Sequence, residues 1–325
     1  MLGHDAVAQA LVDHGVDTMF AVLGDGNLFI GENLVREHGV NLVGATHEAN
    51  AVCMAEGWAK ATGRLGVASV THGPGLTNAM TALVEGTKNR TPMLVVAGDT
   101  PIDNEQHLQN LDQHALVTAS GAGFQAIRNV ESIAEDVSTA VRRALSEHRP
   151  IVINVPLNIE WDEVQYQPRP PLTPPAMRLA PDADQLEVAM GIIASAARPV
   201  VVAGRGAVKS EAKESLIQLG DALGAPLATS LLGTGYFRGE PFDLGIHGTL
   251  SHDVAGETLA SADCLVVFGA SLNYFTTDNQ TLLTGKRVVQ IDLNPSNIDR
   301  NVSIDAGVVG DATVVAQSML ELLKA

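Results

Sequence analysis

A glutamate stands where an apolar, strand-like run gives way to a helix-like one, and this placement favours proton chemistry. Glu48 belongs to the sequence GATHEANA at 44–51, after the apolar run 40–43 and before an Ala-rich segment at about 49–62. Ligands of α/β proteins gather at the carboxyl ends of strands, where a carboxyl group can share a proton with a ligand nitrogen. Taken alone, Glu48 has a plainer interpretation as a first-turn acid that the helix dipole favours.

A Gly-Pro-Gly turn follows about 25 residues further on, in the sequence THGPGLTN at 71–78. A third segment, TPMLVVAGD at 91–99, contains another apolar strand with a polar end. The turn alone could be no more than a tight change of direction. His47 and His72 flank the two motifs, and as neighbours of strand ends we interpret both as structural.

Together these segments resemble the pyrimidine-binding domain of thiamine diphosphate enzymes, and most strongly the acetolactate synthase-like family of 2-oxoacid decarboxylases and carboligases. The resemblance implies a lyase or transferase in which Glu48, in a dry cleft, hydrogen-bonds the aminopyrimidine ring of thiamine diphosphate and activates it. The cofactor then serves as the electron sink for decarboxylation. The resemblance also implies that Gly73, Pro74, Gly75 and Asn78 belong to the cofactor pocket.

Gln109, in the sequence HLQNLD at 107–112, resembles the family's Phe-Gln-x-x-Asp glutamine near the reacting end of the cofactor. Three features depart from the family pattern. Leu108 replaces the phenylalanine, GDGN at 24–27 replaces Gly-x-Pro-Gly, and no basic residue is found at 120–125. Substrate-facing groups are therefore expected to differ from those of a true acetolactate synthase.

The triplet GDG at 24–26 imitates the family's magnesium motif, in which Gly-Asp-Gly is followed by Asn-Asn and the side-chain oxygens hold Mg²⁺. Here the triplet lies in the first strand-to-helix turn, and the sequence contains no Asn-Asn pair. We therefore assign no metal ligand, Asp25 included. The resemblance covers the first two of the family's three domains, and the diphosphate- and Mg²⁺-binding domain is expected to be absent from this chain. By itself the chain is expected to bind thiamine diphosphate weakly or not at all.

The elements that position these residues alternate between strand and helix patterns, which predicts α/β domains with parallel sheets covered on both faces. Predicted strands are 17–23, 40–43, 67–70, 93–97 and 151–155, with helices at 5–15, 49–62, 76–88 and 133–147. These form a pyrimidine-binding domain at 1–160. A Pro-rich linker is predicted at 161–181. A second doubly wound, Rossmann-like domain at 182–325 has strands at 198–204, 226–229, 264–269 and 287–292 and helices at 211–223 and 312–324.

Gly-rich strand ends in the second half resemble the family's middle domain, which carries FAD in acetolactate synthases and ADP in some relatives. They include GRG at 204–206, HGT at 247–249 and GAS at 269–271. Such ends can admit a diphosphate on backbone NH groups. The family's basic residues are replaced by SLN at 271–273. FAD or ADP binding therefore remains open, and plain structural packing is favoured.

Composition limits the partners. The net charge of −17 argues against nucleic acid and anionic membranes. Two cysteines, without a metal-binding spacing, fit free thiols in the cytoplasm. The resemblance implies a 2-oxoacid substrate and a homodimer or homotetramer, or a separate subunit that supplies the diphosphate domain. The alternatives are a non-catalytic nucleotide-binding or regulatory relative that keeps only the fold, and a scaffold that pairs with a full-length relative.

Overall fold

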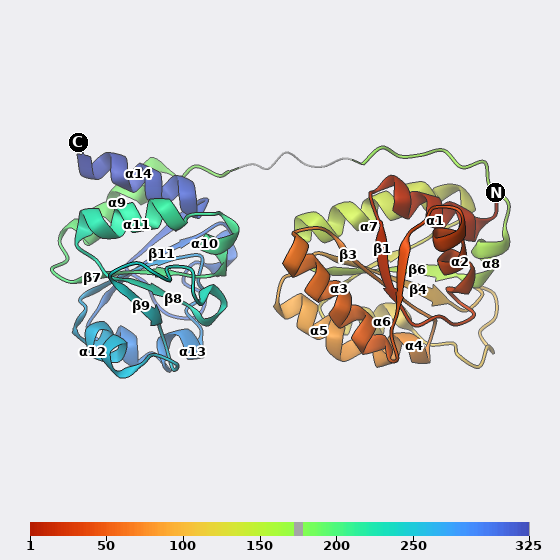
Figure 1. The fold of residues 1–325 in the computed structure, drawn as a ribbon, viewed down its shortest axis with the longest axis horizontal. Helices are drawn as coiled ribbons and strands as arrows, with labels where there is room; N and C mark the ends of the chain where they lie inside the picture. Colours follow the sequence, from red (N-terminus) through yellow and green to blue (C-terminus); the bar gives the residue numbers. More distant parts are fainter. Residues whose placement is uncertain (172–177, 325) are drawn as a thin grey trace. The chain divides into compact units, whose positions relative to one another are not determined.

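The computed structural model describes residues 1–171 and 178–324. The chain divides into two compact units, Met1–Pro174 and Pro175–Ala325. Each unit contains a six-stranded sheet whose strands are all parallel, with helices on both faces (Figure 1). The predicted doubly wound α/β class is thus confirmed. The part of the predicted linker at 172–177 lies outside the described residues.

The sheet of the first unit has the order β2-β1-β3-β4-β6-β5. Its strands are β1 (Thr18–Ala21), β2 (Asn41–Gly44), β3 (Gly66–Val70), β4 (Met93–Asp99), β5 (Gly123–Ala126) and β6 (Pro150–Pro156). Its helices are α1 (Gly3–Asp13), α2 (Leu28–Arg36), α3 (Glu48–Thr62), α4 (Pro74–Asn78), α5 (Met80–Lys88), α6 (Gln113–Ala119), α7 (Ile133–Glu147) and α8 (Leu157–Trp161). The chain runs from β1 outward to β2 and then returns to β3 on the other side of β1. Such a reversal of strand order opens a crevice at the carboxyl ends of the strands, where ligands bind in this architecture.

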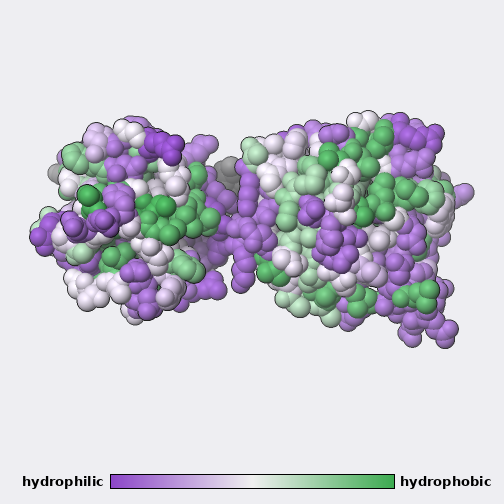
Figure 2. All heavy atoms as spheres, turned by 60° about the horizontal axis from the view of Figure 1, so that its bottom comes forward, coloured by the Kyte–Doolittle hydropathy of each residue, from purple (hydrophilic) through white to green (hydrophobic). Residues whose placement is uncertain are grey.

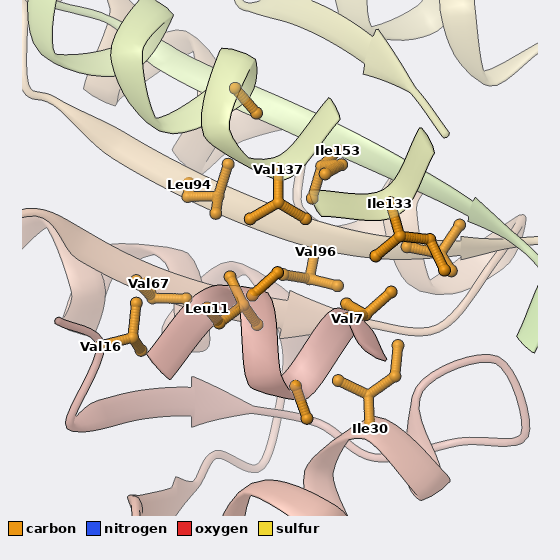
Figure 3. Close-up of a cluster of buried hydrophobic side chains, with 14 of the residues drawn as sticks. Val7, Leu11, Val16, Ile30, Val67, Leu94, Val96, Ile133, Val137 and Ile153 are labelled. Carbon is orange, nitrogen blue, oxygen red and sulfur yellow. The ribbon is translucent and has the colours of Figure 1, made fainter. Parts of the chain in front are cut away.

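Alternating strand residues supply the two apolar layers that hold this sheet between its helices. On one face, Leu94 and Val96 of β4 pack with Leu11 of α1 and Val137 of α7 (Figure 3). On the other face, Val95 of β4 belongs to a second buried cluster with residues of α3, α5 and α6. Because both faces are covered, the sheet is rigid and the loops after its strands have fixed starting points.

The strands and helices predicted for this unit are present, apart from one break, and the structure adds β5, α2, α6 and α8, which were not predicted. The helix predicted at 76–88 is broken at Ala79, which ends α4 and precedes α5. The edge strand β5 was not predicted, because three of its four residues are only partly buried and they carry no clear apolar pattern.

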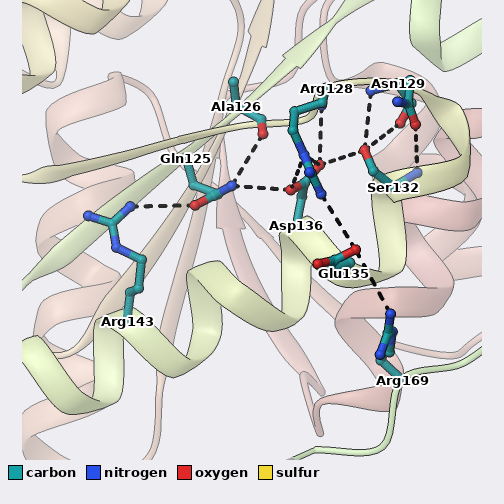
Figure 4. A network of polar contacts seen from close by, with 9 residues as sticks. All are labelled: Gln125, Ala126, Arg128, Asn129, Ser132, Glu135, Asp136, Arg143 and Arg169. Atoms are coloured by element: carbon teal, nitrogen blue, oxygen red, sulfur yellow. Dashed lines mark hydrogen bonds and ion pairs between the residues drawn. The ribbon is translucent and has the colours of Figure 1, made fainter.

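A polar network fastens the edge strand β5 to the start of α7 (Figure 4). At its centre is the carboxylate of Asp136, whose residue is 2% exposed. It accepts hydrogen bonds from Ser132 Oγ at 2.6 Å, from Arg128 Nε at 3.1 Å and from Gln125 Nε2 at 3.2 Å. Four donors, the backbone NH of Arg128 included, compensate the cost of burying this charge.

Residues 162–166, predicted to belong to the linker, are fastened to α1 instead. Gly3 N donates to Asp162 O at 2.9 Å, and Val164 N donates to Met1 O at 2.9 Å. The Tyr166 hydroxyl donates to Asp13 Oδ2 at 2.6 Å. This segment therefore belongs structurally to the first unit.

The second unit has the strand order β12-β11-β10-β7-β8-β9. Its strands are β7 (Pro199–Ala203), β8 (Leu227–Thr229), β9 (Asp243–Ile246), β10 (Cys264–Phe268), β11 (Arg287–Asp292) and β12 (Ala306–Val309). Its helices are α9 (Ala183–Ala194), α10 (Arg205–Lys209), α11 (Lys213–Leu223), α12 (Asp253–Ser261), α13 (Tyr274–Thr277) and α14 (Ala312–Lys324). Across both described ranges, no helix is long and apolar enough to cross a membrane.

Candidate active site

Four loops meet at the carboxyl edge of the first sheet, beside the reversal of strand order. They are residues 24–27 after β1, residues 45–48 after β2, residues 71–78 after β3 and residues 98–112 after β4. Glycines allow this close approach. A Cβ atom on Gly26 would lie 2.3 Å from His72 Nδ1, and one on Gly98 would lie 2.3 Å from Gly26 O. The predicted site residues are thus all located at one edge of one domain.

Glu48 is the first residue of α3, and the preceding His47 caps that helix by accepting a hydrogen bond from Ala49 N at 3.1 Å. The carboxylate of Glu48 accepts a hydrogen bond from Asn78 Nδ2 at 2.9 Å. The two predicted residues are therefore in direct contact. Glu48 is half-buried and Asn78 is exposed, so in this chain by itself the carboxyl group faces partly solvent where a dry cleft was expected.

The Gly-Pro-Gly turn places a bare backbone surface next to Glu48. Gly73 has φ +57°, a value that L side chains disfavour, and precedes Pro74 at the first position of α4. A Cβ atom on Gly75 would lie 2.8 Å from Thr71 Cγ2 and 3.6 Å from Glu48 Oε1. Gly75 therefore lies beside the Glu48 carboxylate, and a side chain at this position would contact it.

Gln109 reaches the same edge through its backbone. A Cβ atom on Gly73 would lie 2.3 Å from Gln109 O, so the loop after β4 rests directly on the Gly-Pro-Gly turn. Gln109 N donates to His107 Nδ1 at 3.2 Å, and the His107 ring contacts the His72 ring at a centroid distance of 5.4 Å. Among the described residues, the contacts of Gln109 with this edge are made by its backbone and its Cβ atom.

The turn at 24–27 is organised by Thr71. Gly26 N donates to Thr71 Oγ1 at 3.2 Å, and Thr71 Oγ1 donates to Asp25 Oδ1 at 3.2 Å. His72 is fully buried, and its Nε2 lies 3.8 Å from Asp25 Oδ1. Asp25 is therefore engaged in local contacts. Within residues 1–171 and 178–324, no group of three or more His, Cys, Asp and Glu side chains could hold a metal ion.

Two buried polar residues near this edge were missed by sequence reasoning. Gln113, 2% exposed, accepts a hydrogen bond from Gly73 N at 2.8 Å. Glu160 in α8 is fully buried, and neither carboxylate oxygen has a hydrogen-bond partner in the structure as described. Burial, followed by the negative charge of Asp25, raises the pKa of Glu160 to about 8. The only sequence signal for Gln113 was a polar residue at the start of an otherwise apolar segment.

The Gly-rich strand ends of the second unit pack against each other. A Cβ atom on Gly204 would lie 2.3 Å from Gly269 O, and one on Gly206 would lie 2.7 Å from Gly269 Cα. Close backbone contact is therefore a sufficient reason for these glycines. Asp292 is used locally, since its Oδ1 accepts hydrogen bonds from Asn294 N and Asn297 Nδ2 at 2.9 Å each.

Hydrophobic residues are visible on the surface of both units in Figure 2. The second unit contains a mainly apolar cavity of about 350 Å³ that has no lysine or arginine in its lining. It is lined by Leu231, Ile246, His247, Thr249, Leu250, Phe275 and Thr276.

Comparison with known proteins assigns both units. Residues 1–116 match the family model of the thiamine pyrophosphate enzyme N-terminal TPP binding domain, and residues 186–319 match that of the central domain. The sulfoacetaldehyde acetyltransferase of Rhodobacter capsulatus is 30% identical over 345 residues, which cover 100% of this chain and 56% of that protein. The acetolactate synthase isozyme 3 large subunit of Escherichia coli is 31% identical over 339 residues, covering 99% of this chain and 58% of that protein. The acetolactate synthase large subunit of Buchnera aphidicola from Acyrthosiphon pisum is 29% identical, with the same coverage of 99% and 58%. The chain thus spans somewhat more than half the length of these relatives, and it belongs to the thiamine pyrophosphate enzyme family, of which it contains the N-terminal TPP binding domain and the central domain.

Proposed function

We propose that this chain supplies the pyrimidine-activating part of a thiamine diphosphate-dependent 2-oxoacid decarboxylase or carboligase of the acetolactate synthase type. The observation that carries the proposal is the contact between Glu48 and Asn78, 2.9 Å apart, beside the bare backbone of Gly75. A carboxylate held at a strand end beside a glycine is suited to a flat, nitrogen-containing ring.

The residues fit the aminopyrimidine ring of thiamine diphosphate. Bound there, the cofactor supplies the electron sink that decarboxylation of a 2-oxoacid requires. The Glu48 carboxylate would accept a hydrogen bond from a protonated ring nitrogen and share its proton. Asn78 fixes the orientation of that carboxylate, and Gly75 lets the ring approach the backbone. Pro74 and Gln109 complete the pocket, with Gln109 on the side of the turn that we assign to the substrate.

Further parts of the proposal concern components outside these two domains. A diphosphate-binding domain, such as one on a separate subunit, would hold Mg²⁺ and the diphosphate group, and a homodimer or homotetramer in the cytoplasm fits the family. Binding of FAD or ADP by the second unit stays a prediction. The mutual packing of Gly204, Gly206 and Gly269 favours a structural role for those strand ends.

The experiment is a titration of the isotope-labelled chain with thiamine diphosphate and Mg²⁺, followed by NMR so that weak binding is detected. The backbone signals of residues 73–78 are expected to shift. Glu48→Gln removes a hydrogen bond between the ligand and a charged group, worth about 1.5–3 kcal/mol. The affinity should therefore fall roughly 10- to 100-fold.

The matched control is Asp184→Asn, which removes an exposed first-turn acid from α9 in the second unit. It alters a helix N-terminus in the same way and should leave the affinity unchanged. Equal affinities of the wild type and Glu48→Gln would contradict the assigned role of Glu48. Shifts confined to the second unit would favour the non-catalytic, nucleotide-binding alternative.

A further inference from the structure

Gln113 lies at the point where the loop after β4 meets the Gly-Pro-Gly turn. It is the first residue of α6 and is 2% exposed. Its Oε1 accepts a hydrogen bond from Gly73 N at 2.8 Å. Its Nε2 donates to Gly98 O at 2.9 Å and to Asn154 Oδ1 at 2.6 Å. One side chain thus joins the ends of β3, β4 and β6.

The orientation of this amide is determined by its partners. A backbone NH can only donate and a backbone carbonyl can only accept, so Oε1 must face Gly73 and Nε2 must face Gly98. Asn154, 4% exposed, therefore presents Oδ1 to Gln113, and its Nδ2 donates to Asp99 Oδ2 at 2.7 Å. Each amide in this series has one arrangement that satisfies its neighbours.

We propose that Gln113 is a positioning residue that holds Gly73 and thereby sets the contact between Asn78 and Glu48. Gly73 is the residue before α4, and Asn78 is the last residue of that helix. The five-residue helix transmits the position of Gly73 to Asn78 because Thr77 N donates to Gly73 O at 3.1 Å. The Asn78–Glu48 hydrogen bond is exposed to solvent, so its geometry depends on where the backbone holds the two residues.

The same side chain links both ends of the proposed site. Gln109 O lies against Gly73, and Gln113 follows four residues later in the same segment. A shift of this loop must therefore move the turn that carries Asn78. The inference rests on the proposed function, because the position of Glu48 matters for catalysis only if Glu48 meets the cofactor.

The test compares Gln113→Met with Val117→Ala in the full chain. Methionine keeps the length and volume of glutamine but makes no hydrogen bonds of this kind. Val117 is a fully buried residue of the same helix that does not touch the turn through hydrogen bonds, so its truncation lowers stability without removing the link to Gly73. The first readout is the NMR signal of the Asn78 side-chain amide in ligand-free protein.

In Gln113→Met this signal should move toward that of a solvent-exposed asparagine, together with the Gly73 amide signal, whereas in Val117→Ala both should stay in place. An unchanged Asn78 signal in Gln113→Met, or an equal shift in Val117→Ala, would overturn the positioning role.

The second readout is the affinity for thiamine diphosphate with Mg²⁺ in a double-mutant cycle with Asn78→Ala. If Gln113 acts through Asn78, the fold-loss of affinity in the double variant should be smaller than the product of the fold-losses in the two single variants. If the fold-loss of the double variant equals that product, the inference is wrong. Should Glu48→Gln bind thiamine diphosphate as tightly as the wild type while the Asn78 signal still responds to Gln113→Met, the proposed function fails and the positioning role stands.

Discussion

Replacing Gly73 by alanine is expected to destabilise the first unit far more than the same change at Gly75. At Gly73 two costs add. The φ of +57° is strained for any L side chain, at about 1–3 kcal/mol. The new methyl group would also lie 2.3 Å from Gln109 O, a backbone atom, and overpacking of this kind costs about 1–3 kcal/mol. The free energy of unfolding should fall by about 3 kcal/mol.

At Gly75 the φ angle is not positive, and a Cβ atom would first meet the side chain of Thr71, at 2.8 Å. Alanine also favours a helix over glycine by about 0.5–1 kcal/mol. These two effects nearly cancel, so the net change should stay within about 1 kcal/mol. The comparison separates backbone strain from the mere loss of a glycine.

Tryptophan fluorescence during urea unfolding is the suitable assay. The chain has two tryptophans, Trp58 and Trp161, and both lie in the first unit. The signal therefore follows that unit alone, which avoids treating a two-unit chain as a single two-state transition. With a slope of about 2 kcal/mol per molar urea, Gly73→Ala should lower the midpoint by about 1.5 M and Gly75→Ala by less than about 0.5 M. Equal shifts of the two variants would refute the assignment of strain to Gly73.

Three further predictions concern buried groups. Asp136→Ala should lower the free energy of unfolding of the first unit by about 3 kcal/mol, because it leaves several buried donors unpaired. Substitution of the neighbouring exposed residue, Glu135→Ala, serves as the control. A small effect of both substitutions would contradict the role assigned to Asp136. The pKa of Glu160 is about 8 in the folded state and about 4.5 in the unfolded chain. Between these pH values the folded state keeps a proton on Glu160 that the unfolded chain has released. The stability of the first unit should therefore fall as the pH rises from about 4.5 to about 8, by an amount on the order of a few kcal/mol, and Glu160→Gln should remove the slope; urea midpoints at pH 5 and 8 decide this. Burial raises the pKa of Cys264 to about 11, whereas Cys53 is exposed, so a thiol reagent at pH 8 should label Cys53 first and Cys264 only on unfolding.

The sequence predicted the architecture because local patterns determine it. Apolar runs such as Val67 to Val70 and Ile151 to Val155 lie in inner strands that are buried on both faces, and such strands need no partner to be recognised. The edge strands β5, β9 and β12 were missed because partial exposure weakens their pattern. The break at Ala79 was missed because no glycine or proline marks it; it becomes visible only when α4 and α5 are packed on the sheet.

The candidate site was predicted in part. The family pattern located Glu48, Gly73, Gly75 and Asn78 in sequence, and the structure brings Glu48 and Asn78 into contact. Gln113 could not be found in this way. Its role depends on the meeting of three strand ends that are far apart in the chain, and no local pattern encodes such a meeting.

The interlocked glycines of the second unit affect how sequence motifs can be used in this family. Gly204, Gly206 and Gly269 each occupy space that a side chain on another would need, so a mutation at any of them disturbs the junction of β7 and β10. Selection for folding alone is then enough to retain this pattern in descendants that have lost, or never had, a nucleotide. A Gly-x-Gly motif at this position therefore indicates the domain fold. Whether a nucleotide binds must be judged from the residues around the motif.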